Sequence, residues 1–227
     1  MKKTILIMTA GLVVLVLIYS LIAFRSRFPR AQRLSSMPGV VDESMDALLR
    51  SLENELKVHR PDIIPFLQPG ISDEQLGQAE ASLGRPVHPE MQALYRWHNG
   101  LVNDLELFPG HGFWSLEQAI RTNRELNEQY REKGFSLLMA HEEHWLILFP
   151  DSAGDGYYYD PEEPYETGGV FYNFREAGYY RKFPSVKNLL KAIVECYQQG
   201  AYLANGETDF ETEDQILNKY GIANEGQ

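Results

Sequence analysis

The residues best suited to chemistry on this chain are carboxylates and tyrosines that gather between positions 151 and 166. Tyrosine rings that reach solvent beside carboxylates suit a protein interface, because aromatic side chains anchor such interfaces and charges guide the encounter. We therefore expect a partner-binding surface formed by Asp151, Asp155, Tyr157, Tyr159, Asp160, Glu162, Glu163 and Glu166.

Three consecutive tyrosines decide how much of this surface is exposed. Neighbouring residues of a strand point to opposite faces, so we expect either Tyr158 alone or the pair Tyr157 and Tyr159 to be buried. In both cases some rings reach solvent. The alternative is that most tyrosines of this region simply pack the core and the rim of a sheet.

Two patterns in the same region imitate metal sites. The segment HEEH at 141–144 resembles a zinc-protease signature, but that motif needs two histidines four residues apart on a helix, and these are three apart between predicted strands. Residues 151–162 place acids at positions 1, 5 and 12 of a calcium loop, but Ala153 occupies a ligand position. We read both segments as polar turns, and we predict no metal and no other cofactor.

The sequence also lacks the usual motifs of catalysis. It has no Gly-x-Ser-x-Gly elbow and no phosphate-binding glycine loop. The only cysteine, Cys196, excludes an internal disulfide and a Cys-based zinc cluster, and no matched histidine can be located for it. We therefore predict no catalytic residues and no enzyme, and a hydrolase that uses the carboxylates is the remaining alternative.

Charge is distributed unevenly along the 227 residues. Residues 1–33 contain six basic residues and no acid, which leaves 15 of the 21 basic residues against all 32 acidic ones and a net charge of −17 for the remainder. Affinity for nucleic acid depends on Lys and Arg, so this body is a poor nucleic-acid binder. It suits a basic protein partner instead.

The N-terminal part predicts a membrane anchor. Residues 4–24 contain no charge, and as a helix they reach roughly 30 Å, enough to cross a bilayer core. A cleaved signal peptide is the alternative, but its apolar region is shorter and small residues follow it. Four arginines follow the span and two lysines precede it, which favours a cytoplasmic body, with the opposite orientation left open.

These features divide the chain into three parts. We expect a single-pass membrane anchor at 1–30, a juxtamembrane linker with Ser-Ser and Pro-Gly at 31–41, and a folded domain at 42–227.

Helices are predicted on both sides of the acidic region. Residues 42–60 place leucines on one face, with Asp42 as the N-cap. A second helix begins at Ser72 with a capping box to Gln75, and Gly84 caps its end.

A third helix runs over 89–98, and Asn99 and Gly100 form its left-handed exit. A fourth begins at Ser115 and extends to about residue 133. Ser185 caps a long helix, and a short acidic helix over 212–220 follows.

Short aromatic and β-branched runs predict strands between these helices, at 135–140, 144–149, 156–160, 169–174 and 179–183. Helices, then a meander of strands, then helices again indicate an α+β fold. We expect an antiparallel sheet of about four to six strands packed with helices, preceded by one N-terminal transmembrane helix.

Several short motifs follow one another in a recognisable order. ISDE at 71–74 precedes Leu76, Glu80 and a Leu-Gly pair at 83–84, and PEMQAL at 89–94 precedes WHNGL at 97–101 and FWSLEQA at 113–119. WLILF at 145–149, GDGYYYD at 154–160, GVF at 169–171 and FPSV at 183–186 complete the order. In this order and spacing they resemble the SUKH superfamily, whose founder is the yeast cell-wall assembly regulator, over residues 71–203.

The resemblance implies a non-catalytic interaction domain and supplies no catalytic residues. Bacterial members are frequently immunity proteins that neutralise a cognate toxin, and many of these toxins are nucleases or deaminases, which tend to be basic. Yeast-type members act as regulators and scaffolds in wall synthesis. We therefore predict a membrane-anchored immunity protein for a basic toxin, with a membrane-linked adaptor of cell-wall or envelope assembly as the alternative.

Overall fold

The computed structural model describes residues 44–102, 105–133, 144–162, 168–174, 178–203 and 206–222. They belong to one compact unit, Glu43–Gln227. The predicted anchor, the linker, the strand at 135–140 and the candidate residues Glu163 and Glu166 lie outside the described residues. Among the residues that are described, no helix combines the length and the apolar character that a bilayer span requires.

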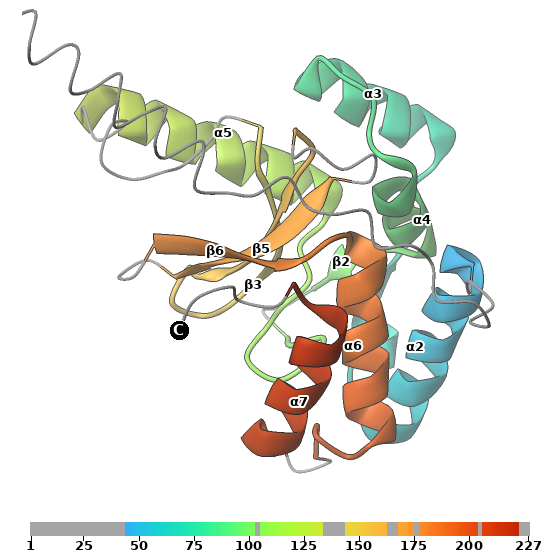
Figure 1. Cartoon of the computed structure of the whole chain (residues 1–227). Helices are drawn as coiled ribbons and strands as arrows, with labels where there is room; N and C mark the ends of the chain where they lie inside the picture. Colours follow the sequence, from blue (N-terminus) through green and yellow to red (C-terminus); the bar gives the residue numbers. More distant parts are fainter. Residues whose placement is uncertain are drawn as a thin grey trace, which may run out of the picture. The chain divides into compact units, whose positions relative to one another are not determined.

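Six α-helices and one short 3-10 helix are described (Figure 1). Their bounds are α2 (Met45–His59), η1 (Ile64–Phe66), α3 (Asp73–Leu83), α4 (Pro89–Trp97), α5 (Leu116–Lys133), α6 (Val186–Gln198) and α7 (Phe210–Tyr220).

Local side-chain caps fix where several of these helices begin. Ser72 and Gln75 form the predicted capping box, with nitrogen–oxygen distances of 2.9 and 3.2 Å, and Ser185 caps α6. The prediction of Asp42 as the cap of α2 is wrong, because the Ser44 hydroxyl accepts the hydrogen bond from the amide of Ala47 at 3.2 Å. A serine that directly precedes the first helical residue makes that bond instead.

The described strands form two antiparallel sheets, which confirms the α+β prediction. The larger sheet has the order β3 (Leu146–Pro150), β4 (Gly156–Asp160), β5 (Gly169–Phe174) and β6 (Gly178–Phe183). The smaller one pairs β1 (Leu67–Pro69) with β2 (His98–Leu101).

Asn99 and Gly100, which were predicted as the exit from the third helix, are the two middle residues of strand β2. Gly100 has a φ of +94°, and a Cβ there would lie 2.6 Å from the amide nitrogen of Ser115. The Asn99 side chain accepts the amide of Leu116 at 3.0 Å and donates to Glu117 at 2.9 Å. This pair of residues therefore ties β2 to the beginning of α5.

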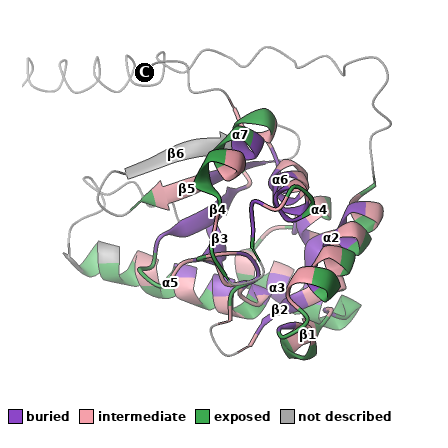
Figure 2. Cartoon of the chain, turned by 90° about the horizontal axis from the view of Figure 1, so that it is seen from below, coloured by how far each residue is buried: buried purple, intermediate pink, exposed green. Residues whose placement is uncertain are grey.

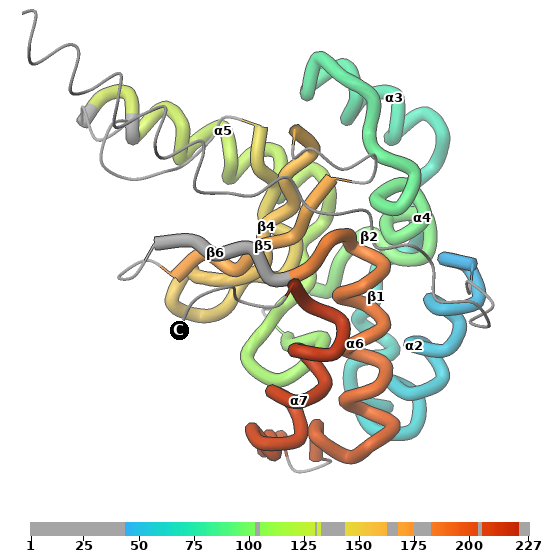
Figure 3. Tube along the Cα trace, viewed as in Figure 1, coloured from blue at the N-terminus to red at the C-terminus, as the bar shows by residue number. Residues whose placement is uncertain are grey.

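Helices cover both faces of the larger sheet. On one face Tyr157, Tyr159 and Val170 join the main core, to which α2, α4 and α6 contribute. On the other face Tyr158 and Phe171 pack in a second cluster, and Trp114 and, from α5, Leu126 pack against it. Figure 1 shows α5 and α6 on opposite sides of the sheet, and the trace in Figure 3 shows α2 beside α6 although they are far apart in sequence.

Candidate functional site

The carboxylate of Asp151 is used by the β3–β4 hairpin itself. One oxygen accepts the backbone amides of Ala153 and Asp155, each at 2.8 Å. The other accepts the hydroxyl of Tyr172 at 3.3 Å. These bonds show that Asp151 stabilises the turn, because a short side chain can accept hydrogen bonds from nearby amides in the way that a backbone carbonyl does in a β-turn.

Asp155 and Asp160 are buried, each with 8% of its surface exposed. Asp160 accepts the amide of Glu162 at 2.9 Å and lies 3.2 Å from the Nε2 atom of His144. The second ring nitrogen of His144 lies 3.5 Å from the carboxylate of Glu162. Asp160 is therefore engaged within the fold, whereas the Glu162 side chain is exposed.

Arg85 adds a cation to the cluster formed by His144, Asp160 and Glu162. Its guanidinium donates to the backbone oxygen of His144 at 2.6 Å. Burial lowers the pKa of Arg85, while the nearby groups of Tyr159, Glu162 and Asp160 act in the opposite direction. The cluster holds the end of β4 against the α3–α4 connection, which is a structural role.

The expectation that some rings of 157–159 reach solvent is wrong. Tyr157, Tyr158 and Tyr159 are exposed by only 3, 2 and 3% of their surfaces. Alternation does send them to opposite faces, but both faces are covered, and β4 has the buried colour along its length in Figure 2. Burial also raises the pKa of the Tyr159 hydroxyl well above its ordinary value. Tyr157 and Tyr159 therefore offer no ring to a partner in this structure.

The structure consequently disperses the predicted surface. Asp151 is half-buried and committed to its turn, Asp155 and Asp160 are buried, and Glu162 is the one exposed member among those described.

The described residues show no group of three or more His, Cys, Asp or Glu side chains that could hold a metal ion. Cys196 is buried in α6. In the segment that imitates a calcium loop, both oxygens of Asp151 already accept hydrogen bonds from the chain.

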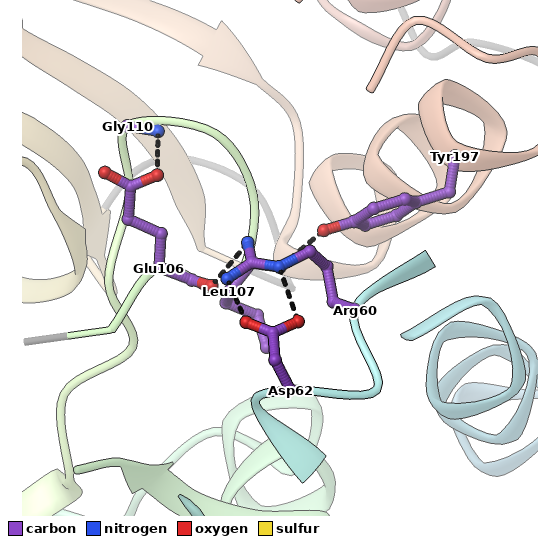
Figure 4. Close-up of polar contacts among 6 residues, drawn as sticks. All are labelled: Arg60, Asp62, Glu106, Leu107, Gly110 and Tyr197. Carbon is purple, nitrogen blue, oxygen red and sulfur yellow. Dashed lines mark hydrogen bonds and ion pairs between the residues drawn. The ribbon is translucent and has the colours of Figure 1, made fainter. Parts of the chain in front are cut away.

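A polar network at the end of α2 fastens the loop at 105–112 (Figure 4). Arg60 makes two bonds to Asp62, at 3.1 and 3.0 Å, and a third to the backbone oxygen of Glu106 at 3.2 Å. The Glu106 carboxylate accepts the amide of Gly110 at 2.9 Å, and the Tyr197 hydroxyl donates to the backbone oxygen of Leu107 at 2.6 Å. The bond from Arg60 lowers the pKa of Asp62. These bonds converge on the backbone of the loop, so we assign the network to loop positioning.

A groove of about 420 Å³ lies between α2 and α4. Arg50, Arg96 and Trp97 are among its lining residues. Arg96 is paired with Asp73 at 2.6 Å, and the Trp97 ring nitrogen donates to Glu53 at 3.1 Å. Two of the polar side chains that line the groove are therefore already engaged within the fold.

Sequence reasoning missed the start of α7. Phe210 is exposed by 76% of its surface, and four carboxylates around it are exposed as well, namely Glu207, Asp209, Glu211 and Asp214. Helical periodicity gives no warning, because Phe210 lies seven residues before the buried Leu217 and shares its side of the helix. The density of acids between 206 and 214 is the signal that points to this surface.

A comparison with protein-family models gives a match. A family model described as the SMI1 / KNR4 family (SUKH-1) matches residues 70–192, which is more than half of the chain. No curated protein matches the sequence significantly. The matched range runs from just before α3 into α6, so α2 and α7 lie outside it.

Proposed function

The chain belongs to the SMI1 / KNR4 family (SUKH-1), and from this membership we propose that it is a non-catalytic domain that binds another protein. More specifically, we propose that the chain is an immunity protein that neutralises a cognate toxin. The family match is the observation that carries this proposal, because membership of this family is consistent with a role as an immunity protein or as a cell-wall regulator.

Charge supports a basic partner. Beyond residue 33 the chain has a net charge of −17. A negative surface accelerates the encounter with a positive one and discourages nucleic acid as a competitor. A toxin that acts on nucleic acid needs a basic active surface, and an acidic protein can cover it.

The proposal includes attachment to a membrane through residues 4–24, with a cytoplasmic body. The absence of charge in this segment and the arginines after it support both parts. Protease accessibility on intact cells tests the orientation, and protection of the body from added protease is the expected result.

Coexpression tests the immunity role. We expect a toxin gene beside the gene for this chain, and we expect the full-length chain, when coexpressed, to restore growth to cells that produce that toxin and to form a stoichiometric complex with it. The complex is expected to weaken as salt rises, because exposed charges are screened. Growth arrest that the chain does not relieve, together with no complex, contradicts the immunity role.

Envelope assembly is the second candidate, favoured by the predicted anchor together with a family that includes wall regulators. It predicts that deletion of the gene sensitises cells to inhibitors of wall synthesis without changing their sensitivity to any toxin. Normal growth of the deletion strain under wall stress contradicts this candidate.

A further inference from the structure

The start of α7 presents the most exposed of the large apolar side chains in the described part of the chain. Phe210 has 76% of its surface exposed, and Leu203, just before the turn that leads into α7, has 40%. One exposed apolar side chain is ordinary on a protein surface. Phe210 differs from an ordinary exposed residue because hydrogen bonds hold the backbone on both sides of it and because acidic residues flank it in the sequence.

The backbone around Phe210 is firmly held. The amide of Asp209 donates to the backbone oxygen of Ala201 at 2.8 Å, and the amide of Leu203 donates to that of Glu207 at 2.9 Å. The Tyr202 hydroxyl donates to the carboxylate of Glu213 at 3.1 Å. A contact group on such a fixed element loses little conformational freedom when it binds, so it can contribute more to affinity.

The sequence on both sides of Phe210 carries charge of one sign. Residues 206–214 contain five carboxylates and no lysine or arginine. The basic residue of α7, Lys219, lies 2.7 and 2.8 Å from the two carboxylate oxygens of Glu195 on α6. Lys219 is therefore occupied at the far end of the helix and does not neutralise its start.

Helix capping explains only part of this acidity. Asp209 is the N-cap, and Glu211 and Glu213 lie in the first turn, where negative charge stabilises a helix. Glu207 precedes the cap and Asp214 follows the first turn, so neither gains much from this effect. Capping also gives no reason for an exposed phenylalanine between the acids.

We propose that the start of α7 is the docking surface for a basic protein, with Phe210 as the apolar anchor and Glu207, Glu211 and Asp214 as its acidic rim. This inference rests on the proposed protein-binding function. The partner it fits has an apolar pocket edged by lysines and arginines, since a cation that packs on the Phe210 ring gains from both the ring and the rim. The family match ends before α7, so this surface belongs to the part of the chain that the family model does not cover.

Peptide selection tests the surface even while the partner is unidentified. A random peptide library is panned against the full-length chain in lipid nanodiscs, after subtraction on empty nanodiscs. We expect the selected peptides to combine basic and apolar residues. Two variants probe the site, Phe210→Ala and the triple change Glu207→Lys, Glu211→Lys and Asp214→Lys.

Each variant has a matched control. Val58→Ala removes another strongly exposed apolar side chain, from α2. Glu125→Lys, Glu128→Lys and Glu132→Lys change the net charge by the same amount on exposed positions of α5. We expect both α7 variants to weaken binding of the selected peptides by about tenfold or more, and both controls to leave it within about twofold.

Three outcomes overturn the proposal: no enrichment of basic peptides, equal loss with the α5 triple variant, and undiminished binding by Phe210→Ala. Without enrichment of basic peptides, the chain has no docking surface for a basic partner. Equal loss with the α5 triple variant shows that only the net charge matters, and undiminished binding by Phe210→Ala shows that Phe210 is not an anchor. These outcomes do not bear on whether the wild-type chain protects cells from a toxin, so a failure of this surface and a failure of the proposed function are separable.

Discussion

In the β3–β4 hairpin, carboxylates and tyrosines lie largely inside the protein, whereas at the start of α7 carboxylates and a phenylalanine lie on its surface. The residue types are nearly the same in both regions. In the hairpin, Asp151 accepts hydrogen bonds from the turn, and the sheet behind it is covered on both faces. In α7, only one side of the helix packs, through residues such as Ile216 and Leu217.

This difference shows that acidic and aromatic composition does not identify an interface by itself. A carboxylate beside two unbonded amides at a tight turn folds back to satisfy them, because a buried amide without a partner is costly. At the start of α7 the Asp209 carboxylate also accepts two backbone amides, yet Asp209 stays at the surface, so hydrogen bonding alone does not decide burial. The two regions can therefore be separated by experiments that measure stability and binding in parallel.

The largest expected effect is on stability at Tyr157. Replacing Tyr157 by Ala removes a ring that packs against Phe108, Tyr172 and Phe183 in the main core. We expect a loss of about 3–5 kcal/mol in the free energy of unfolding. Phe210→Ala, in contrast, is expected to change it by less than about 0.5 kcal/mol.

Urea denaturation of the full-length chain in mild detergent measures both changes. A stable Tyr157→Ala protein that has lost its partner would reverse the comparison, because it would make Tyr157 a contact residue after all.

The next largest effect is the loss of stability when a glycine from each region is replaced by alanine. A Cβ at Gly156 would lie 2.3 Å from the backbone oxygen of Phe149, and its φ is +142°, so Gly156→Ala is expected to cost roughly 2–4 kcal/mol. Gly206, before α7, has a φ of +85° with nothing within 4 Å, so Gly206→Ala is expected to cost only about 1 kcal/mol. Equal melting temperatures for the two variants would contradict the difference in packing.

A third comparison concerns the carboxylates themselves. Asp151→Ala leaves two amides and the Tyr172 hydroxyl without their acceptor, so we expect a loss of about 1–3 kcal/mol in stability. Glu211→Ala is expected to leave stability within about 0.5 kcal/mol. Thermal unfolding checks both, with Ser152→Ala as the control for an exposed position in the same turn. A fully stable Asp151→Ala variant with weakened partner binding would restore the hairpin as the interface.

The smallest effect is a pH dependence of α7. The hydroxyl and amide of Thr212 and the amide of Glu211 hydrogen-bond the Asp209 carboxylate and hold its pKa below the ordinary value. The folded protein therefore favours the charged form. The resulting stability is present above the ordinary aspartate pKa of about 3.9 and is lost as the pH falls through the lower value in the folded protein.

We accordingly expect the melting temperature of the wild type to decrease more on acidification than that of Asp209→Asn, which caps without a charge. Parallel decreases in the two proteins would exclude Asp209 as a contributor to the pH dependence.

Much of the fold could be predicted from local patterns. Ser72 with Gln75 and the strand at 156–160 were both identifiable, because capping and strand alternation involve residues only a few positions apart. The order of motifs also identified the family that the comparison confirms. The candidate site was less predictable, because exposure depends on elements distant in sequence.

The sequence by itself determined most of the helix caps, the main strands, the acidic charge of the body and the family. Only the tertiary structure decided that Tyr158 is buried in a second cluster against which α5 packs through Leu126, and that Phe210 stays exposed although it shares the side of Leu217. The physical reason is that capping and periodicity act within a few residues, whereas burial results from which elements pack together across the whole chain.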